Sequence, residues 1–207
     1  MTPVYFSYIA GAGGKSLINC LYSSEMVYFN EPLPQKILDS VPPHDHINPW
    51  WTYEIHNPPI CKCDGPDPSS ESFGRTRDWG LFEYLNTVDK YVPFVAHYGF
   101  NIECYTQTIG NGPIIKIIPD LEFINLAIGL KWDLLSNGQP ASLCLNEYKK
   151  WEDSLASYSA DLVIDQFNPL SDSFFTHLAQ VTDLLNISIN NDITKLYIEK
   201  YRNYHLV

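Results

Sequence analysis

Residues 5–20 read Tyr5-Phe-Ser-Tyr-Ile-Ala-Gly-Ala-Gly-Gly-Lys-Ser-Leu-Ile-Asn-Cys20, and this stretch decides the fold. The apolar, β-branched and aromatic run over residues 4–9 predicts a strand, and three glycines follow it. After the glycines, apolar residues at helical spacing predict a helix that begins near Lys15. These apolar positions are Leu17, Ile18 and Leu21. The pattern is therefore strand, glycine-rich loop, helix.

A loop of this kind suits a phosphate or a sulfate group. It turns successive backbone N–H groups inward and directs a helix N-terminus at the bend. Lys15 adds a mobile positive charge there, and the Ser16 hydroxyl adds a hydrogen bond at the first turn. The alternative interpretation is a tight turn that carries a surface lysine.

The motif matches the nucleotide-binding phosphate loop only in its second half. The full pattern needs a glycine at position 9, where this chain has Ile9. Residues 9–20 instead resemble the opening loop of the sulfotransferase family, particularly the short sulfotransferase-like proteins of bacteria, cyanobacteria and their phages. In that family the loop grips the 5′-phosphosulfate of PAPS, and the same glycine is often missing. The resemblance implies that the PAPS-binding residues are Gly11, Ala12, Gly13, Gly14, Lys15, Ser16 and Leu17.

Length and composition predict one globular domain over residues 1–207. The chain is 45% hydrophobic and 14% aromatic, which is typical of a folded protein. Its net charge of −11 opposes binding to nucleic acid or to an anionic membrane surface. Five cysteines without a framework spacing, and no apolar leader or membrane-spanning run, predict a cytoplasmic location.

Strands alternate with helices along the chain, which predicts a three-layer α/β sandwich around a mostly parallel sheet. The strand over residues 112–118 is apolar on both faces, as strands of parallel sheets are. The remaining predicted strands cover residues 93–97 and 160–165. Predicted helices cover residues 15–27, 121–135 and 143–155. Three further helices are predicted to begin at Asp78, at Ser171 or Asp172, and at Asn191 or Asp192. The predicted inward side chains of the last two helices include Phe175 and Leu196. The last strand and these two helices also resemble the end of the short sulfotransferase-like proteins.

Residues 32–77 break this alternation. The segment is rich in Pro, Asn, Asp and Ser, and it predicts an irregular insertion, a binding loop or an arm. Trp50, Trp51 and Tyr53 lie in it and are typical of anchors for a protein partner. It also holds five metal-capable side chains, at His44, His46, His56, Cys61 and Cys63. These side chains could assemble a tetrahedral zinc site. Because their spacing does not fit the common zinc knuckle, we favour the alternative of polar loop residues with two incidental thiols.

Two residues are candidates for catalysis. Sulfuryl transfer needs a cation for the leaving group and a base for the acceptor, and Lys15 fits the first role. His97 fits the second, because it follows a predicted strand at the edge of the sheet where ligands collect. The competing interpretation of His97 is a hydrogen-bonded core or edge histidine. We expect Asp165 to accept hydrogen bonds in a turn and His177 to be structural.

One region departs from the family pattern. The 3′-phosphate site of the family places an arginine just after a strand and a serine about two helical turns later. This chain has the acidic Asp120 and Glu122 near the first position and Ala127 at the second. Such a site repels a 3′-phosphate unless Arg75, Arg77 or Lys131 substitutes from elsewhere in the fold.

The sequence supports two hypotheses from different classes. The first is an enzyme that moves a sulfuryl group from PAPS to a hydroxyl or amine acceptor, small molecule or glycan. The second is a catalytically inactive protein with the same fold, phage-encoded and located in the host cytoplasm or the virion, that uses the 32–77 arm for protein contacts. A small nucleotide kinase is a weaker third option because Ile9 breaks its motif.

Overall fold

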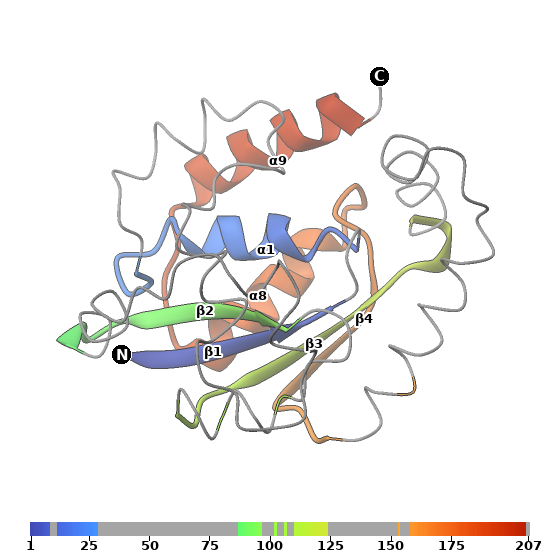
Figure 1. Cartoon of the computed structure of the whole chain (residues 1–207). Helices are drawn as coiled ribbons and strands as arrows, with labels where there is room; N and C mark the ends of the chain where they lie inside the picture. Colours follow the sequence, from blue (N-terminus) through green and yellow to red (C-terminus); the bar gives the residue numbers. More distant parts are fainter. Residues whose placement is uncertain are drawn as a thin grey trace, which may run out of the picture.

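The computed structural model of the chain describes residues 1–8, 12–28, 87–96, 102, 106, 110–123, 153 and 158–205. Its centre is a four-stranded sheet of order β2-β1-β3-β4, in which every pair of neighbours is parallel (Figure 1). The strands are β1 (Thr2–Ser7), β2 (Tyr91–Ala96), β3 (Ile114–Pro119) and β4 (Leu162–Phe167). The prediction of an α/β fold with a parallel sheet is therefore confirmed.

The strands form where the apolar pattern predicts them. The central strand β1 buries every residue after Thr2, and Tyr5 of β1 is paired with Phe94 of β2 and with Ile114 of β3. Pro93 is tolerated within β2 because β2 is the outer strand of the sheet that the described residues form, where a missing N–H need not break a second ladder.

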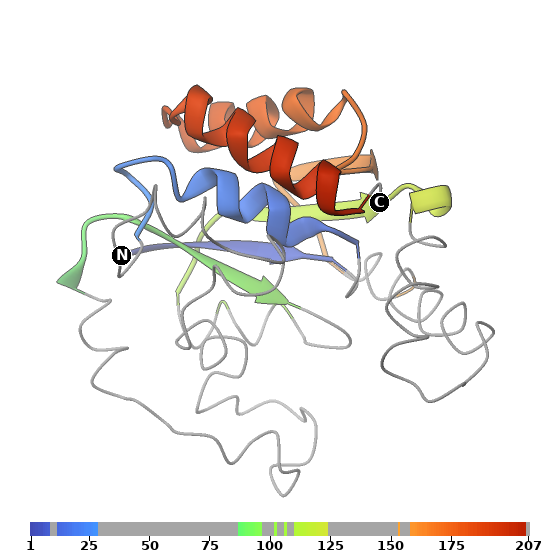
Figure 2. The same cartoon turned by 90° about the horizontal axis from the view of Figure 1, so that it is seen from above.

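Among the described residues, three helices cover one face of the sheet (Figure 2). They are α1 (Gly14–Leu21), α8 (Phe174–Leu185) and α9 (Asn191–His205). Because side chains alternate along a strand, Val4, Phe6 and Tyr8 point into the core beneath these helices. The described helices thus form one helical layer on the sheet. The predicted helix over 121–135 is described only at residues 121–123, and the predicted helix over 143–155 only at Asp153; these described residues are helical.

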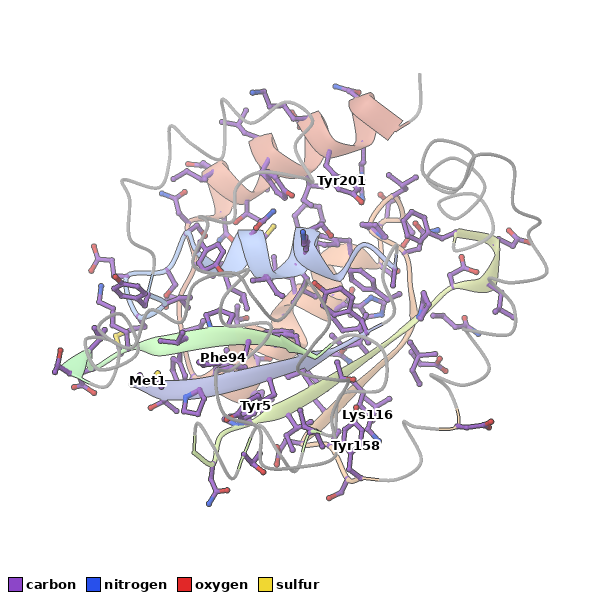
Figure 3. The ribbon with its side chains drawn as sticks, in the orientation of Figure 1. Met1, Tyr5, Phe94, Lys116, Tyr158 and Tyr201 are labelled. Atoms are coloured by element: carbon purple, nitrogen blue, oxygen red, sulfur yellow. The ribbon has the colours of Figure 1, made fainter. Side chains whose placement is uncertain are left out.

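The opposite face of the sheet carries a smaller apolar cluster. Tyr5, Val92, Phe94 and Ile102 pack together there, with the rings of Tyr5 and Phe94 5.8 Å apart between centroids (Figure 3). The sheet is therefore buried on both faces around β1, as the apolar strands predict.

The first helix ends earlier than the sequence predicts. It stops at Leu21 and not near Val27, because the serines that follow close a turn on the helix end. The Ser23 hydroxyl donates to the Cys20 carbonyl (2.7 Å), and the Ser24 N–H donates to the Leu21 carbonyl (2.9 Å). Val27 then forms a parallel bridge with Tyr91 at the start of β2.

Two predicted inward side chains are exposed instead. Phe175 on α8 is 37% exposed and Leu196 on α9 is 50% exposed. Each lies next to a residue that takes the inward position, Phe174 and Tyr197, both of which are fully buried. The first of these helices also begins later than predicted, at Phe174, since Ser171 and Asp172 belong to the turn before it.

Several other predictions lie outside the described residues. These are the 32–77 insertion with its Trp50, Trp51 and Tyr53 arm, the zinc alternative at His44, His46, His56, Cys61 and Cys63, and the helix that begins at Asp78. Within the described part of the chain, no group of three His, Cys, Asp or Glu residues could hold a metal ion. None of the described helices is long and apolar enough to cross a membrane.

Candidate anion-binding site

The candidate site lies at the carboxyl ends of the strands, where the chain reverses its direction of winding. β2 lies on one side of β1 and β3 lies on the other, so the loops that leave β1 and β3 diverge above this edge. In open parallel sheets, ligands bind in the crevice that such a divergence creates. The loop that leaves β1 leads directly to the N-terminus of α1.

Gly13 gives this loop its shape. It is the N-cap of α1 and has a φ of 74°, a left-handed conformation that glycine adopts without a steric penalty. The Gly13 carbonyl accepts hydrogen bonds from the Ser16 N–H (2.9 Å) and from the Ser16 hydroxyl (2.6 Å). Ser16 is fully buried, so its hydroxyl stabilises the turn from within.

Side chains from three elements pack against the two glycines. A Cβ atom at Gly13 would lie 2.7 Å from Pro169 Cγ and 3.4 Å from Phe123 Cε1, and a Cβ atom at Gly14 would lie 2.6 Å from Tyr8 Cδ1. The distances to Pro169 and Tyr8 are shorter than an ordinary van der Waals contact between carbon atoms, and the distance to Phe123 is an ordinary contact. This packing alone requires both glycines, whatever the loop binds.

The electrostatics of the α1 N-terminus favour an anion. No side chain caps the helix at Gly13, and its first turn contains no acidic residue. The first backbone N–H groups of a helix have no partner within the helix and carry the positive end of its dipole. Lys15, half-buried in the first turn, adds a formal positive charge.

Negative charge lies at the end of the neighbouring strand. Asp120 follows β3; its Oδ1 accepts the Glu122 N–H (3.0 Å) and its Oδ2 accepts the Asn168 side-chain amide (3.3 Å). The first contact caps the helical turn of residues 121–123. The second ties the end of β3 to the end of β4, so the Asp120 carboxylate is held at the same edge as the α1 N-terminus.

The structure brings most of the predicted PAPS-binding residues together at the start of α1. Ala12 and Leu17 are fully buried, so their side chains belong to the core and only their main chain can face a ligand. Gly11 and His97 lie outside the described residues, as do Arg75, Arg77 and Lys131. β2 ends at Ala96, one residue before His97, at the same edge of the sheet.

His177 and Asp165 lie close to this edge without joining the loop. The His177 ring packs 5.8 Å from the Phe167 ring, and burial lowers the pKa of its imidazole. Asp165 is exposed and accepts the N–H of Gln166, which has a φ of 51°. Asp165 lies within β4 and not in a turn, so the interpretation of Asp165 as a turn acceptor is not confirmed.

Sequence reasoning missed the residues that shape the loop from outside. Tyr8, Phe123, Asn168 and Pro169 come from three separate segments, and no spacing in the sequence links them. The one available signal was the position of Asn168 and Pro169 directly after the last strand, at the edge where loops meet.

A polar cluster lies on the opposite face of the sheet, behind the candidate site. Ser7 of β1 and Lys116 of β3 are neighbours in register, and Tyr158 packs over both (Figure 3). The Tyr158 hydroxyl donates to Ser7 Oγ (2.6 Å), and Lys116 Nζ donates to the Tyr158 carbonyl and lies 4.1 Å from its ring centroid. Burial lowers the pKa of the Lys116 ammonium and raises the pKa of the Tyr158 phenol.

We expect the change Tyr158→Phe to lower the free energy of unfolding by about 1 kcal/mol, because the buried Ser7 hydroxyl loses its hydrogen-bond donor. Urea denaturation measures this loss. In a Ser7→Ala background the same change is expected to cost almost nothing, since the bond is already absent. Equal losses in the two backgrounds contradict the assignment.

No protein-family model, curated protein or solved structure matches this chain. The fold and the site together define an α/β protein with a parallel sheet and a glycine-turned helix N-terminus at its switch point.

Proposed function

We propose that this chain is a sulfotransferase-like protein with a phosphate-binding loop, which takes the phosphosulfate of PAPS at the N-terminus of α1. The observation that carries the proposal is the α1 N-terminus itself. It lies at the switch point of a parallel sheet, and it has neither a side-chain cap nor an acidic first turn. These features fit the anionic end of PAPS.

In this proposal the chain's own residues orient the donor and the acceptor. The backbone N–H groups of Gly13, Gly14 and Lys15 receive the anionic oxygens, and Lys15 stabilises the charge that develops on the leaving group. PAPS supplies the sulfuryl group. His97 is the proposed base that takes the proton from a hydroxyl or amine acceptor.

Asp120 and Glu122 favour a second candidate function. Their negative charges follow β3, where the resemblance expects a cation for the 3′-phosphate. They support a catalytically inactive protein that retains the fold and acts as a phage structural or protein-interaction module. Such a protein does not need to discriminate PAPS from other anions.

The change Lys15→Ala tests the proposal. We expect PAP, the nucleotide product of PAPS, to raise the melting temperature of the wild-type chain, because a ligand that binds only the folded state stabilises it. Loss of the Lys15 charge should weaken PAP binding about 10- to 100-fold, the size of one charge-assisted hydrogen bond. Thermal-shift titrations with PAP, ATP and sulfate measure both effects.

Lys195→Ala is the matched control, because Lys195 is an exposed lysine on α9 and its loss changes the net charge equally. The control should retain the wild-type response to PAP. If none of the anions stabilises the wild-type chain, the site does not exist and the inactive module is favoured. If the two variants lose the response equally, the effect is one of net charge only.

A further inference from the structure

The turn between β4 and α8, residues 168–173, packs against Gly13 at the start of α1. Pro169 is buried, and its Cγ atom lies 2.7 Å from the position that a Cβ atom at Gly13 would take. The turn is held by Asn168: its Oδ1 accepts the Leu170 N–H (2.9 Å), and its carbonyl accepts the Ser171 N–H and hydroxyl (both 3.1 Å). A displacement of this turn therefore moves the group that packs on Gly13.

A single residue of the C-terminal helix holds the far side of this turn. Arg202 Nη2 donates to the Ser171 carbonyl (2.6 Å), and Arg202 Nη1 lies 3.5 Å from Asp172 Oδ1. The guanidinium also lies over the Phe175 ring, 5.9 Å from its centroid. The Asp172 side chain is fully exposed, so that ion pair contributes little, and the bond to the Ser171 carbonyl is the main restraint.

The rest of α9 is attached to α1 by other contacts. Asn19 of α1 donates to the Tyr197 hydroxyl (3.0 Å), and the Ser23 hydroxyl lies 3.4 Å from that of Thr194 and accepts the Asn190 N–H (3.2 Å). Tyr201 is buried and lies on the side of α9 that faces α1 (Figure 3). These contacts do not involve Arg202, so we expect α9 to stay attached to α1 when Arg202 is replaced.

We propose that Arg202 is a positioning residue of the anion site. By holding the turn of residues 168–173 it keeps Pro169 against Gly13, and the packed proline keeps the Gly13 turn in the conformation that directs the first N–H groups of α1 toward the anion. The inference rests on the proposed function, because it concerns the same site. It gives the C-terminal helix control over anion affinity without any contact with the ligand.

The test compares Arg202→Gln with Lys200→Gln in the full chain. Lys200 is exposed, belongs to the same helix and carries the same charge, so it controls for net charge. We expect Arg202→Gln to weaken sulfate and PAP binding about tenfold, which corresponds to a change of about 1.4 kcal/mol, and Lys200→Gln to leave both affinities unchanged. Isothermal titration with sulfate and with PAP gives the dissociation constants.

A second readout needs no ligand. The Ser16 N–H is hydrogen-bonded to the Gly13 carbonyl, so its hydrogen exchange reports how firmly the turn is held. We expect Arg202→Gln to speed the exchange of this amide selectively and to leave the amides of Ile198 and Val181 unchanged. Pro169→Ala should reproduce the effect, and combining it with Arg202→Gln should add little, since both act through the same contact.

Three outcomes overturn the proposal. Arg202→Gln could keep the wild-type anion affinity, or Lys200→Gln could lose as much anion affinity as Arg202→Gln. Faster exchange throughout α8 and α9 would indicate that Arg202 is merely structural. If the wild-type chain binds neither sulfate nor PAP, the proposed function fails separately. The exchange of the Ser16 amide then decides the role of Arg202: selective acceleration supports the restraint, and an unchanged rate contradicts it.

Discussion

Phe167→Ala is expected to lower the free energy of unfolding by about 3–5 kcal/mol, the cost of removing a buried phenylalanine ring from a packed core. Phe167 is the last residue of β4 and is fully buried. Its ring packs against those of Phe174 (6.0 Å between centroids) and His177 (5.8 Å). The cavity therefore opens between the sheet and α8, and urea denaturation measures the loss.

Phe175→Ala is the matched control for this change. It removes the same side chain one residue after Phe174 on the same helix, but Phe175 is 37% exposed. We expect a smaller loss than for Phe167→Ala, since more than a third of the Phe175 side chain already faces water. Similar losses in the two variants contradict the assigned orientation of α8, on which Phe174 is buried and Phe175 is not.

The parallel sheet was predictable because its signals are local. Each strand contains a short run of apolar, mostly β-branched or aromatic residues, and the run in β3 is interrupted only by Lys116. Such runs are typical of strands in parallel sheets, which are covered on both faces. The start of α1 was equally visible, since the glycines and Lys15 mark it directly. These predictions needed no knowledge of distant residues.

The predictions that failed depended on contacts between distant segments. Nothing within residues 15–27 shows that Val27 pairs with Tyr91, and that pairing takes the chain away from the helix. Likewise, Leu196 and Tyr197 are both compatible with an inward face of α9. The choice between them is fixed by the hydrogen bond from Asn19 to the Tyr197 hydroxyl.

The candidate site likewise has one part that the sequence predicts and another that depends on distant contacts. Its anion-facing part, Gly13 to Ser16, could be read from the motif, and the opposing charge of Asp120 was visible beside its strand. The parts that hold the loop could not. Pro169 lies 156 residues after Gly13 in the sequence, and Arg202 lies on a helix with no motif of its own, so only the fold shows that they act on one turn.

Gly14→Ala is expected to lower the free energy of unfolding by about 2–3 kcal/mol, a cost typical of forcing an extra methyl group into a packed site. The new Cβ atom would lie 2.6–2.7 Å from three atoms of the Tyr8 ring, which is buried. In an unobstructed helix the same change is favourable by up to about 1 kcal/mol, because alanine is the better helix former. The sign of the change is therefore diagnostic, and chemical denaturation measures it.

Tyr8→Leu provides the background that isolates the clash. A leucine at this position leaves room above Gly14, so in that background we expect Gly14→Ala to be neutral or stabilising. An unchanged penalty in the Tyr8→Leu background shows that the ring is not the obstacle.

The change Gly14→Ala should also affect sulfate binding. Because the ring of Tyr8 approaches the first residue of α1, we expect the clash to tilt the first turn, and the variant to lose sulfate binding even where it remains folded. If Gly14→Ala is destabilised but binds sulfate with wild-type affinity, Gly14 is needed for packing and not for binding. That result contradicts the assignment of the α1 N-terminus as the anion site.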